Sequence, residues 1–303
     1  MEKPHILHLF TPAAQASPFD VNMAYDAGYH AVVPYTGMSV ADVTTLTQDA
    51  IFSRGPKGVK RTGIFIGGRE LGLALEMFDA ASKAMVPPFE VSVFVDPSGA
   101  FTTAAAAVAA VERRLKASFD TGLPGKSVLV LGGTGPVGTA SAVLAAQEGA
   151  RVRLASSSAL DRAQGSCRMV RERYRLEVEP VLADARSLGA LMADAHVVIA
   201  AAKAGVEVLP ASALAAGREL LVAADVNAVP PAGVAGVGVM DDGVPLGAAS
   251  GKAQGIGALA IGNVKYQVER GMFEQMLGAE KAVYLDFRQA FAQARELVRE
   301  RKS

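Results

Sequence analysis

The chain of 303 residues holds 30 Lys and Arg residues against 30 Asp and Glu residues, and 50% of it is hydrophobic. Its length suits one large or two ordinary domains, and its balanced charge argues against nucleic acid or an anionic membrane as a partner. No stretch of about twenty residues is free of polar side chains, so we expect no transmembrane segment.

The first 120 residues alternate short apolar runs with longer helical patterns. Residues 1–10 lack a long apolar segment and predict a strand instead of a signal peptide. Ser17 as a cap with Pro18 behind it predicts a helix entry, and we expect Thr102 and Thr103 to open an alanine-rich helix. The expected strands are 6–10, 31–33, 63–66 and 91–95, and the expected helices are 20–27, 40–52, 70–84 and 103–117. Such alternation predicts a parallel sheet covered by helices.

A glycine-rich loop follows a turn-forming linker at 121–125 and a buried-strand pattern at 127–131. Its sequence GGTGPVG, at 132–138, contains the G-x-G-x-x-G spacing, and a helix at 137–148 and a strand at 152–155 come next. In such a loop the first glycine permits a tight turn and the second lets a pyrophosphate approach the backbone. The third lets the helix pack on the strand. This order of elements predicts a dinucleotide site.

The remaining chain continues the alternation. Cys167, the single cysteine, excludes an intrachain disulfide and fits a reducing cytoplasm, and its place in a predicted helix indicates a structural role. Further strands are expected at 178–182, 197–200 and 220–223, and two helices at 256–277 and 282–301, the last returning to the first domain. The fold class is therefore α/β with two α/β domains. We expect an N-terminal parallel-sheet substrate domain, 1–120 with the helix at 282–303, and a Rossmann-type NAD(P)-binding domain, 121–281.

Polar and turn-forming residues follow the predicted strands of both domains. They lie at 17–20, 34–37, 96–99 and 102–103 in the first domain, and at Lys203 and 225–231 in the second. Open α/β sheets bind ligands outside the carboxyl ends of their strands, and clefts between domains are favoured sites. Each segment alone fits ordinary capping and turn chemistry. Together they predict a ligand site at these strand ends.

Six phrases accompany the glycine loop: SPFDVN at 17–22, QDAIFSR at 48–54, TGIFIGG at 62–68, FTT at 101–103, ADVNAVPPAG at 224–233 and GIGALAIGNVK at 255–265. With the loop, they resemble the NAD(P)-dependent methylene-tetrahydromethanopterin dehydrogenases of bacterial one-carbon metabolism. The resemblance covers essentially the whole chain, and its last two phrases are far more specific than the loop.

The resemblance implies an enzyme that transfers a hydride from methylene-tetrahydromethanopterin to NADP or NAD during formaldehyde oxidation. It implies a pterin cleft, with the first domain binding the pterin, and a cytoplasmic homo-oligomer, trimeric or hexameric. The sequence shows no Ser-His-Asp spacing, metal cluster or paired carboxylate, and His5 and His8 face opposite sides of a strand. The reaction needs none of these, because a nitrogen lone pair expels the hydride without any proton transfer. Holding the bridging carbon at about 3–3.5 Å from C4 of the nicotinamide supplies most of the catalysis.

The resemblance also implies roles for residues of the pterin site. Lys265 matches the lysine of the family's GNVK phrase and is expected at the polar edge of the pterin ring; a solvated helix lysine is the alternative. Phe19 and Asp20 are expected to flank the pterin, by stacking and by stabilising the product cation. Thr102 and Thr103 either bind the ligand or cap their helix. The predicted catalytic residues are Lys265 and Asp20, and the predicted substrate-binding residues are Phe19, Asn22, Tyr35, Ser98, Thr102 and Thr103.

The cofactor site has serines where an NAD-specific site has an acidic residue, at the end of the second strand of its domain. Hydroxyls tolerate a 2′-phosphate and Arg162 is nearby, so we expect NADP with some use of NAD, although strictly NADP-using relatives have an arginine near Ser157 or Ser158. Asn227 is expected at the nicotinamide end and Lys203 at the phosphates. The predicted cofactor-binding residues are Gly133, Thr134, Gly135, Pro136, Val137, Gly138, Ser156, Ser157, Ser158, Arg162, Lys203, Asp225 and Asn227, and no metal is expected.

Two other functions remain open from the sequence. An NADP-dependent methylene-tetrahydrofolate dehydrogenase would use the same hydride chemistry on another pterin. A non-catalytic NAD(P)-sensing module would bind the nucleotide without any pterin, and the polar strand ends of the first domain count against it. A methenyl cyclohydrolase activity is conceivable because Lys265 resembles an active-site lysine, but the resemblance favours dehydrogenation alone.

Overall fold

The computed structural model describes residues 3–300, and the chain forms two compact units. The first unit runs to Thr102 and includes Tyr266–Gln293; the second is Thr103–Lys265 with the chain from Ala294 onward. These divisions fall inside three helices, α5 (Ala100–Phe119), α10 (Ala258–Gly278) and α11 (Phe287–Glu300). The sequence placed the divisions at the ends of predicted helices, near 120 and 281, because only turns and linkers are visible as boundaries in a sequence.

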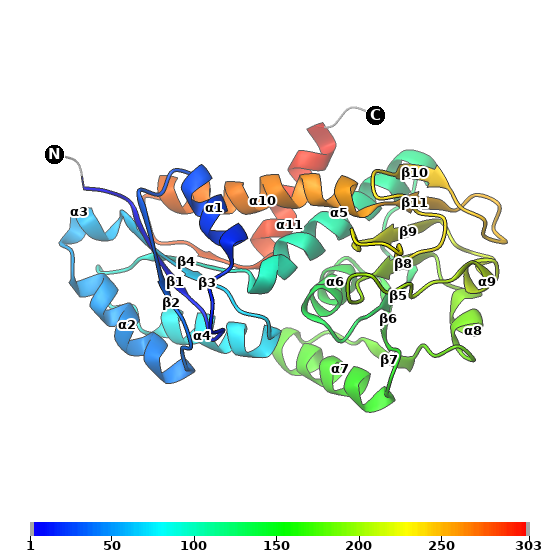
Figure 1. Ribbon diagram of the computed structural model, residues 1–303, viewed down its shortest axis with the longest axis horizontal. Helices are drawn as coiled ribbons and strands as arrows, with labels where there is room; N and C mark the ends of the chain where they lie inside the picture. Colours follow the sequence, from blue (N-terminus) through cyan, green and yellow to red (C-terminus); the bar gives the residue numbers. More distant parts are fainter. Residues whose placement is uncertain (1–2, 301–303) are drawn as a thin grey trace. The chain divides into compact units, whose positions relative to one another are not determined.

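The first unit is built on five parallel strands in the order β12-β4-β3-β1-β2. In chain order this is the 2-1-3-4-5 arrangement of flavodoxin-like sheets, whose switch point lies between β1 and β3. Helices α2 and α4 pack on each other, and both contact this sheet (Figure 1). The strands are β1 (Ile6–Phe10), β2 (Ala31–Tyr35), β3 (Thr62–Ile66), β4 (Ser92–Val95) and β12 (Tyr284–Leu285). The helices are α1 (Pro18–Asp26), α2 (Val40–Phe52), α3 (Pro56–Val59) and α4 (Leu71–Lys83), and a 3-10 turn, η1 (Pro97–Gly99), follows β4.

Of the helix starts predicted for this unit, the one at Ser17 is confirmed and two others are wrong. Ser17 caps α1 as expected, with its hydroxyl accepting the N–H of Asp20 at 3.4 Å and Pro18 in the first helical turn. The expectation that Thr102 and Thr103 open a helix is wrong, because α5 already begins at Ala100. The predicted helix at 282–301 also begins too early, since β12 occupies its first turn; its predicted end at 301 lies outside the described residues. A strand of two residues is too short to show any periodicity.

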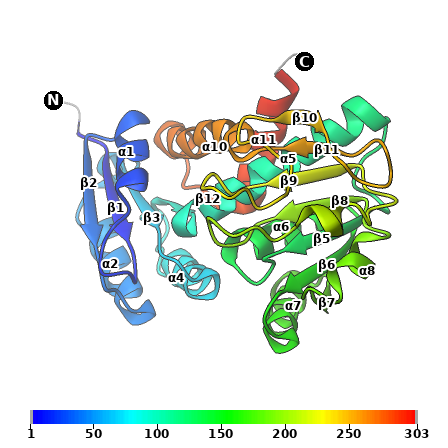
Figure 2. The same cartoon turned by 45° about the vertical axis from the view of Figure 1, so that its right-hand side comes forward.

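The second unit contains seven strands in the order β10-β11-β9-β8-β5-β6-β7. Without β10, this is the 3-2-1-4-5-6 order of the Rossmann fold, with its switch point between β5 and β8. Strands β9, β8, β5 and β6 lie side by side in Figure 2, and α6 and α7 pack on the sheet. The strands are β5 (Ser127–Leu131), β6 (Arg151–Ser156), β7 (Glu179–Leu182), β8 (Val197–Ala200), β9 (Val222–Asp225), β10 (Asp242–Pro245) and β11 (Gln254–Ile256). The helices are α6 (Pro136–Gln147), α7 (Leu160–Tyr174), α8 (Leu188–Met192) and α9 (Ala211–Leu214).

The antiparallel hairpin of β10 and β11 did not emerge from the sequence. Its register shifts between Asp242 and Val244, and Gly243 between them has a φ of +94°. Such a bulge disturbs the alternation that identifies a strand. The predicted helix at 256–277 is correct in kind, but Ile256 ends β11 and the helix begins at Ala258.

Cys167 is buried in α7, where burial raises the pKa of its thiol to about 11. A thiol that stays protonated at neutral pH is a poor nucleophile, which agrees with the structural role expected from the sequence. Within residues 3–300, no helix combines the length and the apolar character needed to cross a membrane.

His8 is expected to make the folded protein less stable in mild acid. It is half-buried on β1, and burial together with the charge of Arg54 lowers its pKa below 6.5. As the pH falls, His8 in the unfolded chain takes up a proton before His8 in the folded chain does. The free energy of unfolding is therefore unaffected by His8 above about pH 6.5 and decreases as the pH falls below that value. Melting temperatures at about pH 7.5 and about pH 5.5 should differ less in His8→Gln than in the wild type. An unchanged difference would contradict this role.

Candidate functional site

The glycine loop after β5 makes a tight turn at Gly132. This residue has a φ of +69°, and a Cβ there would lie 2.6 Å from the backbone nitrogen of Ala202, which follows β8. Only glycine combines such a conformation with so close an approach. The turn thus falls one residue before Gly133, where the G-x-G-x-x-G spacing placed it, and Gly132 is absent from the predicted site residues. The doubled glycine was the available signal.

Gly133 and Gly138 bring the loop and the helix α6 into contact. A Cβ on Gly138 would lie 2.6 Å from the Cα of Gly133, and a Cβ on Gly133 would lie 2.7 Å from the side chain of Leu154 on β6. The hydroxyl of Thr139 donates to the carbonyl of Gly133 at 2.8 Å. The third glycine therefore has the packing role expected from the sequence.

Gly135 leaves the start of α6 open. It is the N-cap of this helix, it offers no side-chain cap, and a Cβ there would meet only the carbonyl oxygen of Gly132, at 3.5 Å. The first N–H groups of a helix have no partner inside it and attract anions. Pro136, which has no N–H to lose, occupies the first turn, and Thr134 and Val137 are half-buried beside it. The residues present therefore fit a dinucleotide pyrophosphate.

Gly135→Ala is expected to preserve the fold and to weaken dinucleotide binding. The added methyl group has room within the protein but occupies the place where a phosphate would approach the backbone. We expect the Kd for NADPH to rise roughly tenfold, about 1.4 kcal/mol, with little change in melting temperature. NADPH fluorescence titration measures the first quantity.

Two further glycine variants frame this prediction. Gly138→Ala should lower both affinity and melting temperature, because its methyl group would meet backbone atoms. Gly165→Ala in α7 has open space around the new methyl group and should change neither. Equal NADPH affinity in Gly135→Ala and Gly165→Ala would contradict the assignment of the phosphate site to this loop.

The end of β6 presents hydroxyls and a guanidinium. Ser156 is buried and its Oγ accepts the N–H groups of Ser158 and Ala159, at 3.4 and 3.3 Å. Ser157 and Ser158 are exposed, and Nη1 of Arg162 lies 3.5 Å from the Oγ of Ser158. In a Rossmann unit this strand end faces the adenosine ribose. A hydroxyl and a guanidinium held together suit a 2′-phosphate.

The ends of β8 and β9 carry the other predicted cofactor residues. Lys203 is exposed on the loop after β8. Asp225 and Asn227 are buried at the end of β9, and their side chains bind backbone groups of the chain. The structure thus brings Lys203 and Asn227 to neighbouring loops at one edge of the sheet.

In the first unit, Asp20 lies at the switch point between β1 and β3. Its side chain is 3% exposed, and a Cβ on Gly67, just after β3, would lie 3.5 Å from its Oδ2. The same Cβ would lie 4.0 Å from Thr11, just after β1. Doubly wound sheets bind ligands where the strand order reverses. A buried carboxylate at this position is therefore a strong candidate for ligand binding.

Three other predicted residues surround the first two strands. Phe19 is 43% exposed and Asn22 is exposed on α1. Tyr35 is half-buried at the end of β2, where its hydroxyl and His8 Nδ1 are 3.2 Å apart. The ring of Tyr35 also stands edge-on to Phe10, with centroids 5.4 Å apart. Tyr35 is thus fixed by the sheet, whereas Phe19 presents apolar surface to its surroundings.

The loop after β4 is organised by Asp96, which was not among the predicted site residues. Its fully buried carboxylate accepts the N–H of Phe101 at 2.7 Å and the hydroxyl of Thr102 at 2.6 Å. Asp96, and not Thr102, thus accepts the N–H groups in the first turn of α5, to which Thr102 adds its own hydroxyl as a donor. Ser98 is exposed in the left-handed region, at φ 55°, and its hydroxyl donates to Gly68 O at 2.8 Å.

Lys265 and Thr103 belong to the second unit. Lys265 is half-buried on α10, and Ile261, Val264 and Val268 of the same helix are buried. Thr103 is half-buried on α5. The remaining predicted pterin residues belong to the first unit.

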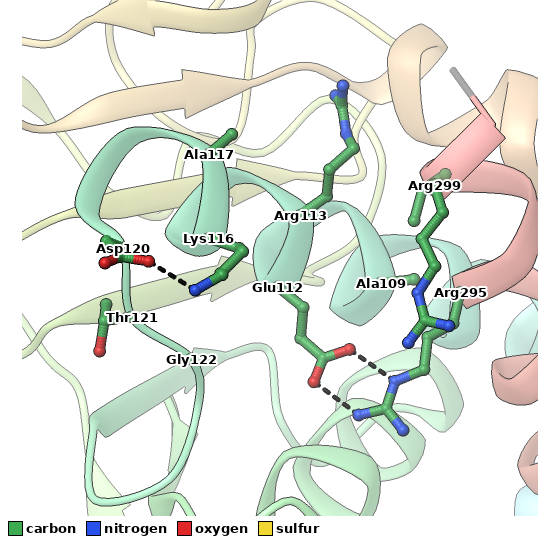
Figure 3. A pocket seen from close by; sticks show the side chains of 11 residues that line it. Ala109, Glu112, Arg113, Lys116, Ala117, Asp120, Thr121, Gly122, Arg295 and Arg299 are labelled. Atoms are coloured by element: carbon green, nitrogen blue, oxygen red, sulfur yellow. Dashed lines mark hydrogen bonds and ion pairs between the residues drawn. The ribbon is translucent and has the colours of Figure 1, made fainter. Parts of the chain in front are cut away.

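A hollow of about 690 Å³ in the second unit lies between the ends of α5 and α11 (Figure 3). Arg295 donates to the two carboxylate oxygens of Glu112 at 2.7 and 2.6 Å, and Lys116 pairs with Asp120. None of the predicted site residues lines it. Within this lining Arg295 pairs with Glu112 and Lys116 with Asp120, and Arg113 pairs with Asp242 outside it, so we assign the hollow no part in binding.

Comparison with known proteins gives consistent results. A family model for the N-terminal part of methylene-tetrahydromethanopterin dehydrogenase matches residues 18–98. An NAD(P)-dependent methylenetetrahydromethanopterin dehydrogenase of Methylorubrum extorquens is 50% identical over 96% of this chain and 98% of its own length. The bifunctional protein MdtA of the same organism is 34% identical over the same shares.

A solved structure supports the fold. Quinate dehydrogenase from Corynebacterium glutamicum, in complex with NAD, is similar with a TM-score of 0.52 over 96% of this chain and 98% of that chain. At 15% identity this likeness concerns the fold alone.

Proposed function

Since the chain belongs to the family of NAD(P)-dependent methylenetetrahydromethanopterin dehydrogenases, we propose that it oxidises methylene-tetrahydromethanopterin to the methenyl form with NADP or NAD. Identity of 50% over nearly the whole chain is the observation that supports this most directly. The open phosphate cradle at Gly135 and the buried carboxylate of Asp20 at the switch point of the other sheet add independent physical support. The proposed nucleotide-binding residues all belong to the second unit, whereas the proposed pterin-binding residues belong to the first unit except for Lys265 and Thr103.

In the proposed reaction the protein has to align the pterin with the nicotinamide and to stabilise the charge that develops on the pterin. The nicotinamide, when bound, supplies the hydride acceptor. The first turn of α6 binds the pyrophosphate, and the serines after β6 bind the ribose. Asp20 stabilises the positive charge that develops on the pterin as hydride leaves, because a buried carboxylate acts in a medium of low dielectric constant. Lys265 orients the polar edge of the pterin.

An absorbance assay with both pterins and both nucleotides tests the function. Methylene-tetrahydromethanopterin should be oxidised with NADP and, more slowly, with NAD. Faster turnover of methylene-tetrahydrofolate would favour the folate alternative instead. Nucleotide binding without turnover of either pterin would favour a sensing module.

The cofactor preference is expected to depend on Arg162. Its guanidinium lies beside the Ser158 hydroxyl, where a 2′-phosphate would bind. Arg162→Ala should raise the KM for NADP roughly tenfold, about 1.4 kcal/mol, and leave the KM for NAD unchanged. Arg168→Ala, an exposed arginine further along α7, is the matched control. Equal effects on both nucleotides would place the 2′-phosphate elsewhere.

We also propose a cytoplasmic homo-oligomer, trimeric or hexameric, on the family resemblance. Light scattering coupled to gel filtration measures the subunit number. A monomer at assay concentration would contradict the proposal.

A further inference from the structure

Asn227 joins two loops at the carboxyl edge of the second unit's sheet. Its amide oxygen accepts the N–H of Val229 at 2.9 Å within its own loop, and the N–H of Gly205 at 3.1 Å in the loop after β8. Its amide nitrogen donates to the carbonyl of Pro231 at 2.8 Å. With 6% of the residue exposed, both ends of the amide are used by backbone groups.

Asp225, the last residue of β9, binds the backbone of the loop that contains Asn227. Its carboxylate is 1% exposed and accepts the N–H groups of Asn227 at 2.9 Å, Gly233 at 2.7 Å and Val234 at 3.2 Å. A Cβ on Gly233 would lie 2.6 Å from its Oδ1, so the loop is wrapped closely around the carboxylate. The position of Asn227 is therefore determined before any ligand binds.

The loop held by Asn227 contacts the phosphate-binding turn. The N–H of Ala201 donates to the carbonyl of Leu131 at 2.8 Å, and Ala202 lies against Gly132. Gly205 is thus tied to β9 by Asn227, while Ala201 is tied to β5. Lys203 lies between these two attachments, on the loop that follows β8, and β8 is the strand next to β5.

We propose that Asn227 is a positioning residue for the cofactor, which fixes the loop after β8 so that Lys203 is held beside the phosphate-binding turn. This assignment rests on the proposed function, because it requires a dinucleotide in the second unit. It replaces a direct contact between Asn227 and the nicotinamide by an action through Lys203. A lysine whose loop backbone is already fixed loses less conformational entropy on binding an anion than a lysine on a free loop.

Asn227→Ser separates the two parts of the network. A serine hydroxyl can still accept the N–H two residues ahead, as in a serine turn, but it is too short to reach Gly205 or Pro231. If the connection between loops positions Lys203, this variant should raise the Kd for NADPH roughly tenfold. Lys203→Met should raise it by a similar factor, and the double variant by little more than either change alone.

The readout is equilibrium titration of NADPH fluorescence, with the wild type first. A wild type that does not bind NADPH would refute the proposed function itself. If the wild type binds and Asn227→Ser binds equally well, or if the two changes multiply to roughly 100-fold, the positioning role is refuted while the proposed function stands. Leu188→Ala, in the buried cluster of the same unit, is the control for general destabilisation and should lower the melting temperature without changing the Kd.

Discussion

Lys265→Met is expected to lower kcat for the pterin by roughly 100-fold while the Kd for NADPH stays unchanged. Methionine keeps most of the length and the apolar stem of lysine but has no ammonium group. Lys265 is half-buried on a helix whose neighbouring Val264 and Val268 are buried, so the stem remains accommodated and the fold should persist. The loss then reports the charge and its hydrogen bonds to the pterin.

Lys252→Met provides the matched control, because Lys252 is exposed in the same unit and outside every predicted site. It should leave kcat, KM and the Kd for NADPH unchanged. Wild-type kinetics in Lys265→Met would remove the proposed role of Lys265. A parallel loss of NADPH affinity would instead indicate that this lysine serves the cofactor.

The sequence was sufficient for the parallel sheets and for the glycine loop. Buried parallel strands such as Ser127–Leu131 are continuous apolar runs, and the G-x-G-x-x-G spacing is local. Both can therefore be recognised from the sequence alone. The hairpin of β10 and β11 and the two-residue strand β12 were missed because a bulge and a very short edge strand give no periodic signal.

The site was harder to predict because a sequence does not show which atoms its polar groups bind. Asp96 follows a predicted strand and its sequence neighbours indicated only a turn. In the structure its carboxylate accepts hydrogen bonds from Phe101 and Thr102 in the first turn of α5. Asn227 was identified as important, but its link to Gly205 crosses 22 positions of the chain. A residue type and its place after a strand predict a ligand site; they do not show whether the side chain binds the ligand or the loop.

The two sheets have different strand orders, and each has its own switch point. The Rossmann order of the second unit places the glycine loop beside β8. The flavodoxin-like order of the first places the ends of β1 and β3 together, and Asp20 lies there. Each sheet therefore offers one binding edge, for which the rule that ligands bind at switch points applies independently.

Asp20→Asn is expected to lower kcat by roughly 100-fold while the Kd for NADPH stays unchanged. Asparagine keeps the shape of the side chain, and the hydroxyl of Ser17 accepts from the backbone of residue 20, so the helix cap survives. The substitution removes only the charge of this buried side chain, so a fall in kcat with an unchanged Kd for NADPH identifies an electrostatic role at the pterin. Asp26→Asn, exposed at the end of the same helix, should have wild-type kinetics. Full activity in Asp20→Asn would show that the cation needs no carboxylate there.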